Sequence, residues 1–151
     1  MAVELAVAAV VLGAVALLAG GSPAPRHHDD AQFRWSSHAL PALTRLVGDL
    51  TSLGSDAAPG SPAAPRMARD AAALQADLAS AKSLGPPPAQ ALRPGWNATL
   101  TRVGSVAASS EATVAAAGSP SYDVQLTGLR SAIAGAGDAL IQLAGGLRTT
   151  A

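Results

Sequence analysis

The sequence predicts an all-α protein, an up-down-up-down four-helix bundle preceded by an N-terminal apolar helix. Three observations predict this class. From residue 33 onward, apolar residues recur at steps of three and four along four segments. Short stretches rich in Pro and Gly separate these segments, and no run alternates long enough to make a strand. Short connections favour antiparallel neighbours. A three-helix bundle with one disordered end is the alternative.

The composition indicates one folded domain with few chemical options. Ten basic and ten acidic residues cancel, so no general attraction to nucleic acid is expected. Apolar residues make up 49% of the chain but aromatic residues only 3%, so the core should be built from Ala, Leu and Val. The absence of Cys excludes disulfides, thiolate metal sites and a lipid-modified Cys. We expect an anchor or signal segment at 1–22, a polar linker at 23–31 and the bundle at 32–150.

The N-terminal segment contains an uncharged apolar run at residues 5–21. A spanning helix needs about 17–25 such residues, whereas the core of a signal peptide usually has about 7–15. The run therefore predicts a single membrane anchor, or a cleaved signal if the small residues Ala19 and Gly21 mark a cleavage site. A buried apolar helix of a soluble domain is the third interpretation.

Charges around this run leave both orientations open. No Lys or Arg precedes it, and the first cations that follow are Arg26 and Arg34, which by the positive-inside rule would leave the body in the cytoplasm. Export would place the body on the other side. In the linker, residues 27–30 read His-His-Asp-Asp. Adjacent residues on a polar spacer do not preorganise a coordination shell, so no metal site is predicted there.

Each helical segment has its own start and stop signals. Ser36 or Ser37 is the expected cap of the first helix, with Pro41 in or near its first turn; a helix beginning near Asp29 would instead be kinked by Pro41. Ser-Pro pairs precede the second and fourth helices, and Gly85 and Gly118 follow the second and third.

The predicted core is one apolar stripe per helix. The last helix has the most regular stripe, with steps that alternate between four and three as in a heptad seam. Gly135 and Gly137 within it are expected where a neighbouring helix comes close, and Arg130, which flanks the stripe, is expected to tolerate Ala. The four stripes are Phe33, Leu40, Leu43, Leu46, Val47, Leu50 and Leu53; Met67, Ala71, Leu74, Leu78 and Ala81; Leu92, Trp96, Leu100, Val103, Ala107 and Val114; and Tyr122, Leu126, Leu129, Ile133, Ala136, Leu140, Leu143 and Leu147.

The aromatic residues are expected to gather at one end of the bundle. In an up-down bundle the first and third helices run the same way, so Phe33, Trp35 and Trp96 begin at the same end. Phe33 and Trp96 fit their stripes and are expected to close the core. Trp35 fits less well and is expected to face outward, toward a membrane interface if the anchor is retained.

No catalytic, cofactor-binding or metal-binding residue is predicted. Of the three His, two lie in the linker, and His38 has no partners that would make it a general base. A di-metal bundle needs several inward-facing carboxylates, whereas this chain has Glu4 in the N-terminal segment and Glu111 alone in the third helix. His38 and Met67 are the one conceivable haem-ligand pair, and Met67 lies at a core position.

The stretch ADLASAKSLGPPPAQALRPGWNATL, residues 76–100, ends one helix before a Pro run and places a Trp early in the next. Over residues 65–147 this layout resembles small uncharacterised actinobacterial proteins that are membrane-anchored or exported and helical; the resemblance implies no particular activity. Together these features predict a non-enzymatic bundle that binds the membrane through its N-terminal segment and a protein partner in or near the cell envelope. A small-molecule binding or sensor bundle with an Ala-lined pocket is the alternative.

Overall fold

The computed structural model describes residues 30–58 and 64–149, and this part of the chain is helical without strands. The helices are α2 (Asp30–Asp56), α3 (Ala64–Ser83), α4 (Arg93–Ala115) and α5 (Tyr122–Thr149), with a short 3₁₀ helix, η1 (Gln90–Leu92), before α4. The predicted all-α class and its four helices are confirmed. The predicted N-terminal apolar helix lies outside the described residues.

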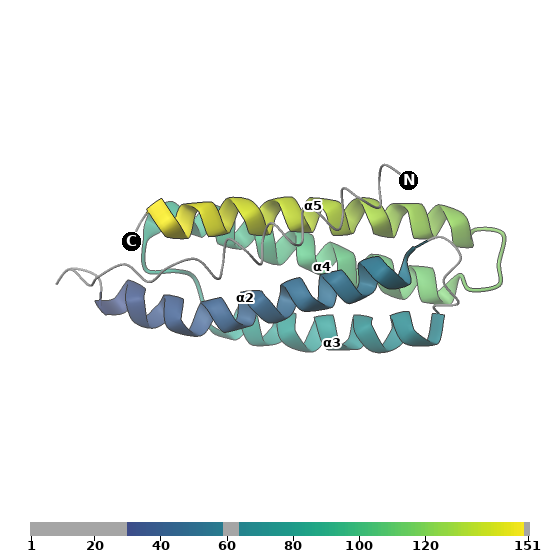
Figure 1. Ribbon diagram of the computed structural model, residues 1–151, viewed down its shortest axis with the longest axis horizontal. Helices are drawn as coiled ribbons and strands as arrows, with labels where there is room; N and C mark the ends of the chain where they lie inside the picture. The colour runs from purple at the N-terminus through teal and green to yellow at the C-terminus, as the bar shows by residue number, and fades with distance from the viewer. Residues whose placement is uncertain (1–29, 59–63, 150–151) are drawn as a thin grey trace.

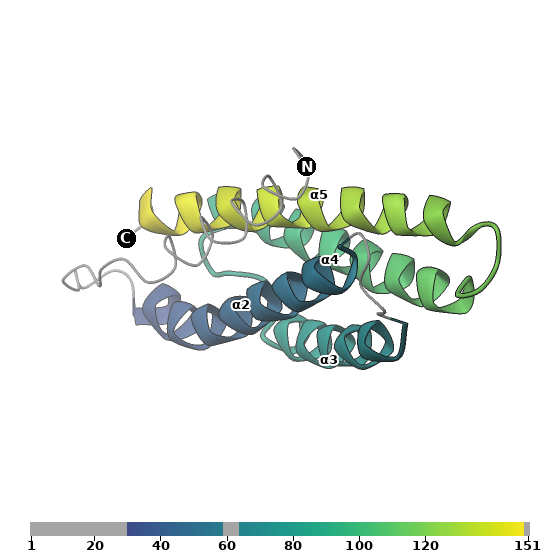
Figure 2. The same ribbon diagram turned by 45° about the vertical axis from the view of Figure 1, so that its right-hand side comes forward.

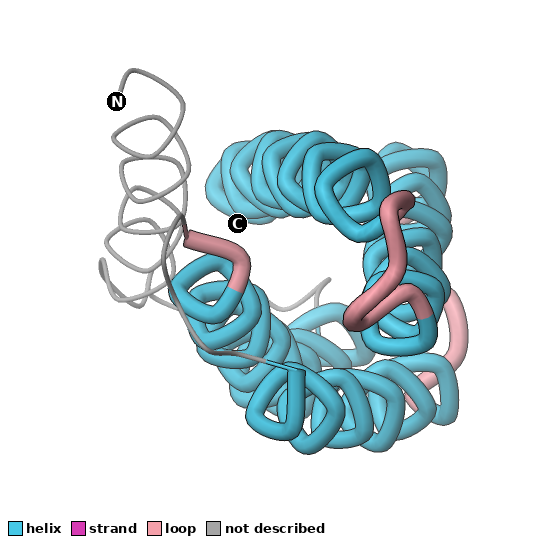
Figure 3. The backbone as a smooth tube through the Cα atoms, turned by 90° about the vertical axis from the view of Figure 1, so that its right-hand side faces the viewer, coloured by secondary structure: helices cyan, strands magenta, loops and turns pink. Residues whose placement is uncertain are grey.

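The helices alternate in direction along the chain (Figure 1): α2 and α4 run one way, and α3 and α5 run back. Each helix packs on the next in sequence, and Figure 2 shows α4 and α5 lying side by side over most of their length. Seen along the bundle, the four helices surround a common axis (Figure 3), and the contact that closes the circle between α5 and α2 is the least extensive.

The buried residues follow the predicted stripes. All five predicted positions of α3 are buried. In α5, Leu129, Ile133, Ala136, Leu140 and Leu143 are buried, while the terminal members of its stripe are half-buried. The core cluster draws on all four helices. Leu40 of α2 and Leu100 and Val114 of α4 are half-buried as well.

The glycines predicted to end helices do so. Gly85 has a φ of 71° and Gly118 a φ of 78°, a left-handed backbone that a residue with a Cβ rarely adopts. Each turns the chain out of the preceding helix, α3 before Pro86 and α4 before Pro120. Because both connections are short, α3 is fixed beside α4 and α4 beside α5.

The predicted cap of the first helix at Ser36 or Ser37 is wrong, and the alternative start near Asp29 is the one that the structure supports. α2 begins at Asp30, so Ser36 and Ser37 lie inside it, as do the last two residues of the expected linker. The Ser37 hydroxyl does not cap the helix; it donates to the carbonyl of Arg34 at 2.8 Å. Pro41 lies well inside α2 and is exposed. Its ring faces solvent, where the carbonyl left without its helical donor can be hydrated.

At the aromatic end of the bundle, Trp35 and Phe33 have the reverse of their predicted orientations. Trp35 and Trp96 meet edge to face, with ring centroids 5.0 Å apart and planes at 77°. The Trp35 indole N–H donates to the carbonyl of Gly85 at 3.2 Å. Phe33, expected in the core, is 61% exposed. Trp35 therefore faces inward, against Trp96 and the α3–η1 connection, and Phe33, two residues earlier on the opposite side of α2, faces outward.

A Cβ at Gly135 would meet a side chain and no backbone of a neighbouring helix, so the close helix approach predicted there is not what the structure shows. The Arg102 guanidinium of α4 donates to the Gly135 carbonyl at 3.2 Å, and a Cβ at this glycine would lie 3.1 Å from that group. The expectation for Arg130 overlooked a contact: its Nε donates to the carbonyl of Ala57 at 2.6 Å, just beyond the end of α2. Arg130 thus satisfies a terminal carbonyl of another helix.

Candidate functional site

The residues weighed at the outset as conceivable ligands or catalysts are not brought together. His38 is exposed on α2, whereas Met67 is buried in the core at the beginning of α3. Because α2 and α3 are antiparallel, these two residues lie toward opposite ends of the helix pair (Figure 1). Among the described residues, no group of three or more His, Cys, Asp or Glu could hold a metal ion. His27, His28 and Asp29 lie outside them.

A group of carboxyl side chains, absent from the predicted sites, lies between α2 and α3. We call Asp49 and Asp56 of α2 with Asp70 and Asp77 of α3 the aspartate cluster. The ion pairs Arg45–Asp77 and Arg66–Asp56 set the register of the two helices. Asp49 lies one turn from Arg45 and Asp70 one turn from Arg66, so Asp49 is near Asp77 and Asp70 is near Asp56. Each pair contains one aspartate from each helix, in the order that antiparallel helices require.

Both helices place these residues at the same spacing. In α2, Asp49 follows Arg45 by four positions and precedes Asp56 by seven; in α3, Asp70 follows Arg66 by four and precedes Asp77 by seven. The two helices therefore present matching faces, related by an approximate two-fold axis across their contact. This repeated spacing beside two apolar stripes is the sequence feature from which the aspartate cluster could have been predicted. Single-helix stripe analysis misses it, because the pattern appears only when the two helices are aligned.

An arginine lies at each end of the cluster. Arg45 pairs with Asp77 at 3.0 Å, and Arg66 lies 3.6 Å from Asp56. Both arginines are more than half exposed, with side-chain exposures of 53% and 58%. Water therefore screens the arginine side of each pair. The value of about 0–1 kcal/mol typical of surface ion pairs applies to Arg45–Asp77, whereas the Asp56 side chain is only 1% exposed and its pair with Arg66 is half-buried. The arginines leave part of the carboxylate charge uncompensated.

Two oxygens of the cluster lack a donor. Asp56 is buried, at 2% exposure, and neither its Oδ2 nor the Oδ2 of Asp49 has a hydrogen-bond partner. Burial away from water, followed by the negative charges of Asp77 and Asp70, raises the pKa of Asp49 to about 6. Burial is also the main cause that raises the pKa of Asp56, with Asp70 next and with Arg66 and Arg69 opposing.

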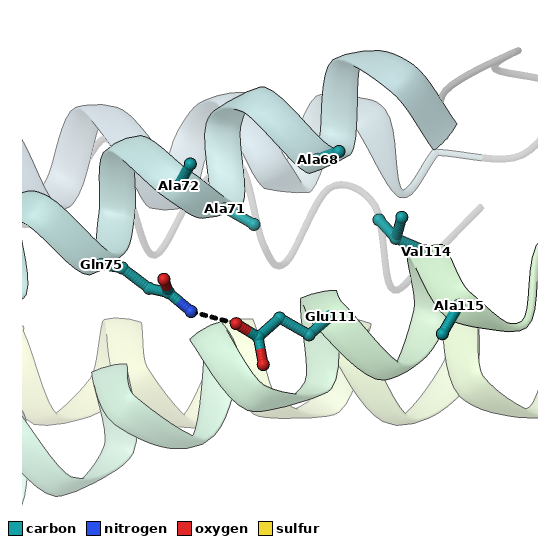
Figure 4. Close-up of a pocket in the computed structure, with 7 residues that line it drawn as sticks. All are labelled: Ala68, Ala71, Ala72, Gln75, Glu111, Val114 and Ala115. Atoms are coloured by element: carbon teal, nitrogen blue, oxygen red, sulfur yellow. Dashed lines mark hydrogen bonds between the residues drawn. The ribbon is translucent and has the colours of Figure 1, made fainter.

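The second feature is a shallow hollow of about 270 Å³ between α3 and α4 (Figure 4). Its walls are mostly small apolar side chains, and it is open to solvent. The Gln75 amide donates to the Glu111 carboxylate across one end. The lining residues are Ala68, Ala71, Ala72, Gln75, Glu111, Val114 and Ala115. Most ligand pockets have about 300–1,000 Å³ and several convergent polar groups, so this hollow is small for a ligand.

Comparisons with known proteins assign neither feature: no family model, curated protein or solved structure matches this chain. None of the helices within residues 30–58 and 64–149 has the length and apolar character needed to cross a membrane.

Proposed function

We propose that this protein is a non-enzymatic helical bundle, anchored to the membrane or exported by its N-terminal segment, that binds a protein partner in or near the cell envelope. The observation that carries the proposal is the uncharged apolar run at residues 5–21, which the short segment SPAPRHHD (residues 22–29) separates from α2. Burying such a run in lipid is strongly favourable, whereas leaving it in water is not.

The first turns of α2 support this proposal. Phe33 is 61% exposed and lies close in sequence to the apolar run. An exposed aromatic ring next to a membrane segment can bury its apolar face against the lipid interface or a bound protein. The interfacial role expected for Trp35 thus passes to Phe33, because Trp35 already packs on Trp96.

The chemistry of the described side chains is consistent with binding rather than catalysis. The Trp35 indole donates to a backbone carbonyl, as does the Thr99 hydroxyl. Arg102 and Arg130 likewise donate to backbone carbonyls of other segments. Groups used in this way hold helices together and are not available to a substrate.

Cell fractionation tests the location. The full-length chain should sediment with membranes and resist carbonate extraction, or appear outside the cell with a new N-terminus near Gly21. Replacing Leu12 and Leu17 with Arg should abolish both outcomes, since a charged residue costs about 2.5–3.5 kcal/mol at the centre of a spanning helix. Val124→Ala is the matched control, because it removes an exposed apolar residue of α5 that is distant from the run in sequence. Wild-type protein in the soluble fraction at its intact mass would contradict the proposal.

The hollow between α3 and α4 favours a second candidate, a small-molecule sensor. Ala68, Ala71, Ala72 and Ala115 line it, as the Ala-lined alternative requires. Melting temperatures should then rise saturably with a ligand from a small-molecule library. Ala72→Leu, which fills the hollow from an exposed position, should abolish that rise. A ligand that still stabilises the Ala72→Leu variant would bind elsewhere and exclude this site.

A further inference from the structure

The aspartate cluster presents an unusual arrangement of acceptors. Hydrogen bonding normally joins a donor to an acceptor, but an ionised carboxylate only accepts. The ion pairs Arg45–Asp77 and Arg66–Asp56 across the α2–α3 contact place Asp49 near Asp77 and Asp70 near Asp56. The Oδ2 atoms of Asp49 and Asp56 are buried and have no donor. A buried acceptor without a donor destabilises the folded state. One proton per pair would supply the missing donor.

The charged side chains around the aspartate cluster do not supply the missing hydrogen-bond donor. Arg45 of α2 pairs with Asp77. Arg66 of α3 lies near Asp56, and the positive charges of Arg66 and Arg69 lower the pKa of Asp56 by less than burial and Asp70 raise it. From α5, Arg130 reaches this end of α2 but donates to the Ala57 carbonyl.

Charges from the remaining elements point elsewhere. Glu111 of α4 is bonded to Gln75 at the α3–α4 contact. Arg34, His38 and Lys82, which are charged or titratable groups of α2 and α3 away from the cluster, are exposed near the opposite end of the helix pair.

We propose that the α2–α3 contact is a proton-dependent switch: Asp49 and Asp56, each holding a proton, join α2 to the aspartates of α3, and the contact loosens when Asp49 and Asp56 lose these protons. The proton comes from solvent and returns to it, so no other reactant is needed. This inference goes beyond the proposed function and does not depend on it, because it concerns only the described helices.

The direction of the pH effect follows from the raised pKa values. The folded state holds the proton of Asp49 up to about pH 6, whereas the ordinary value is 3.8. Relative to the fully ionised protein, the stabilisation by this proton is therefore complete below about pH 4 and is lost as the pH rises through 6. Asp56 acts in the same direction. The α2–α3 contact should be tighter in mildly acidic than in neutral solution.

Thermal unfolding of the full-length chain at about pH 5 and about pH 7.5, at constant ionic strength, tests the switch. The wild-type melting temperature should be higher at the acidic pH by about 3–6 °C. Asp49→Asn replaces a charge with an amide donor of the same shape, so it should raise the melting temperature at the neutral pH and reduce this difference. Asp56→Asn should do the same through the other pair. Asp123→Asn, at an exposed position of α5, is the matched control and should keep the wild-type difference.

Hydrogen exchange locates the change. After correction for the intrinsic pH dependence of exchange, amides of α2 and α3 around the four aspartates should lose protection at the neutral pH, while those of α4 and α5 facing each other should not. Equal melting temperatures at the two pH values, or an unchanged difference in both Asn variants, would overturn the proposal. So would a divalent cation that restores the acidic melting temperature at neutral pH, because a metal ion would then be the missing partner.

Discussion

The helix pairs α2–α3 and α4–α5 solve the same packing problem with opposite polar chemistry. Between α4 and α5, donors meet backbone acceptors: the Thr99 hydroxyl donates to the carbonyl of Ala139 at 3.3 Å, and Arg102 donates to Gly135. Between α2 and α3, carboxyl acceptors face carboxyl acceptors, and the Oδ2 atoms of Asp49 and Asp56 stay unpartnered. The first arrangement is complete in one protonation state, whereas the second needs added protons.

This difference teaches where a small helical bundle can respond to its surroundings. Both pairs contribute to one apolar core, so the core alone cannot make them behave differently. The polar groups at the edges of the core determine whether a helix pair responds to pH. A hydroxyl or guanidinium keeps its donors through the physiological pH range, whereas a carboxyl pair does not. Three predictions compare the two pairs, in order of decreasing effect.

The largest effect should come from the shared core, and it should be alike in both pairs. Leu140 of α5 and Leu74 of α3 are buried. Truncating either to Ala should lower the free energy of unfolding by about 2–5 kcal/mol. Urea denaturation measures this free energy of unfolding. Gln142→Ala, at an exposed position, is the control and should change it by no more than about 0.5 kcal/mol. A large cost at Leu140 with none at Leu74 would mean that α2 and α3 unfold separately from the rest.

The apolar pattern predicted the fold well because it is local to each helix. The stripe of α3, and the central part of that of α5, could be listed before any packing was known, since a period of 3.6 residues alone determines which positions share a face. The helix-ending Gly85 and Gly118 are equally local, because their backbone angles favour glycine.

What the sequence could not predict depends on partners distant in the chain. Arg130 reaches Ala57, Trp35 reaches Gly85, and the aspartates of α2 meet those of α3. Each contact requires the alignment of two helices, which a stripe on one helix does not contain. The sequence-based prediction therefore placed Phe33 in the core and Trp35 outside, the reverse of the structure, and it did not include the aspartate cluster.

Thr99→Val should have a smaller effect, and it isolates the polar chemistry of α4–α5. The substitution keeps the shape of a buried side chain but removes the donor to Ala139, so it should cost about 0.5–1.5 kcal/mol. Urea denaturation should give the same cost in acidic and neutral solution, because no carboxyl takes part in this contact. A cost that changes with pH would remove the distinction between the two helix pairs.

The smallest effects should come from glycines inside the helices. Gly48 of α2 and Gly128 of α5 have open space where a Cβ would lie, whereas a Cβ at Gly135 would lie 3.1 Å from the Arg102 guanidinium. Ala is favoured over Gly in a helix by about 0.5–1 kcal/mol. Gly48→Ala and Gly128→Ala should therefore each stabilise the bundle by that amount. Gly135→Ala should stabilise it less, because the new methyl displaces Arg102 from the Gly135 carbonyl. Urea midpoints of the three variants decide this, with Gly128→Ala as the control in the same helix. If Gly135→Ala stabilised the protein as much as Gly128→Ala, the Arg102 contact would contribute nothing, and the α4–α5 pair would owe its stability to apolar packing and the Thr99 hydroxyl.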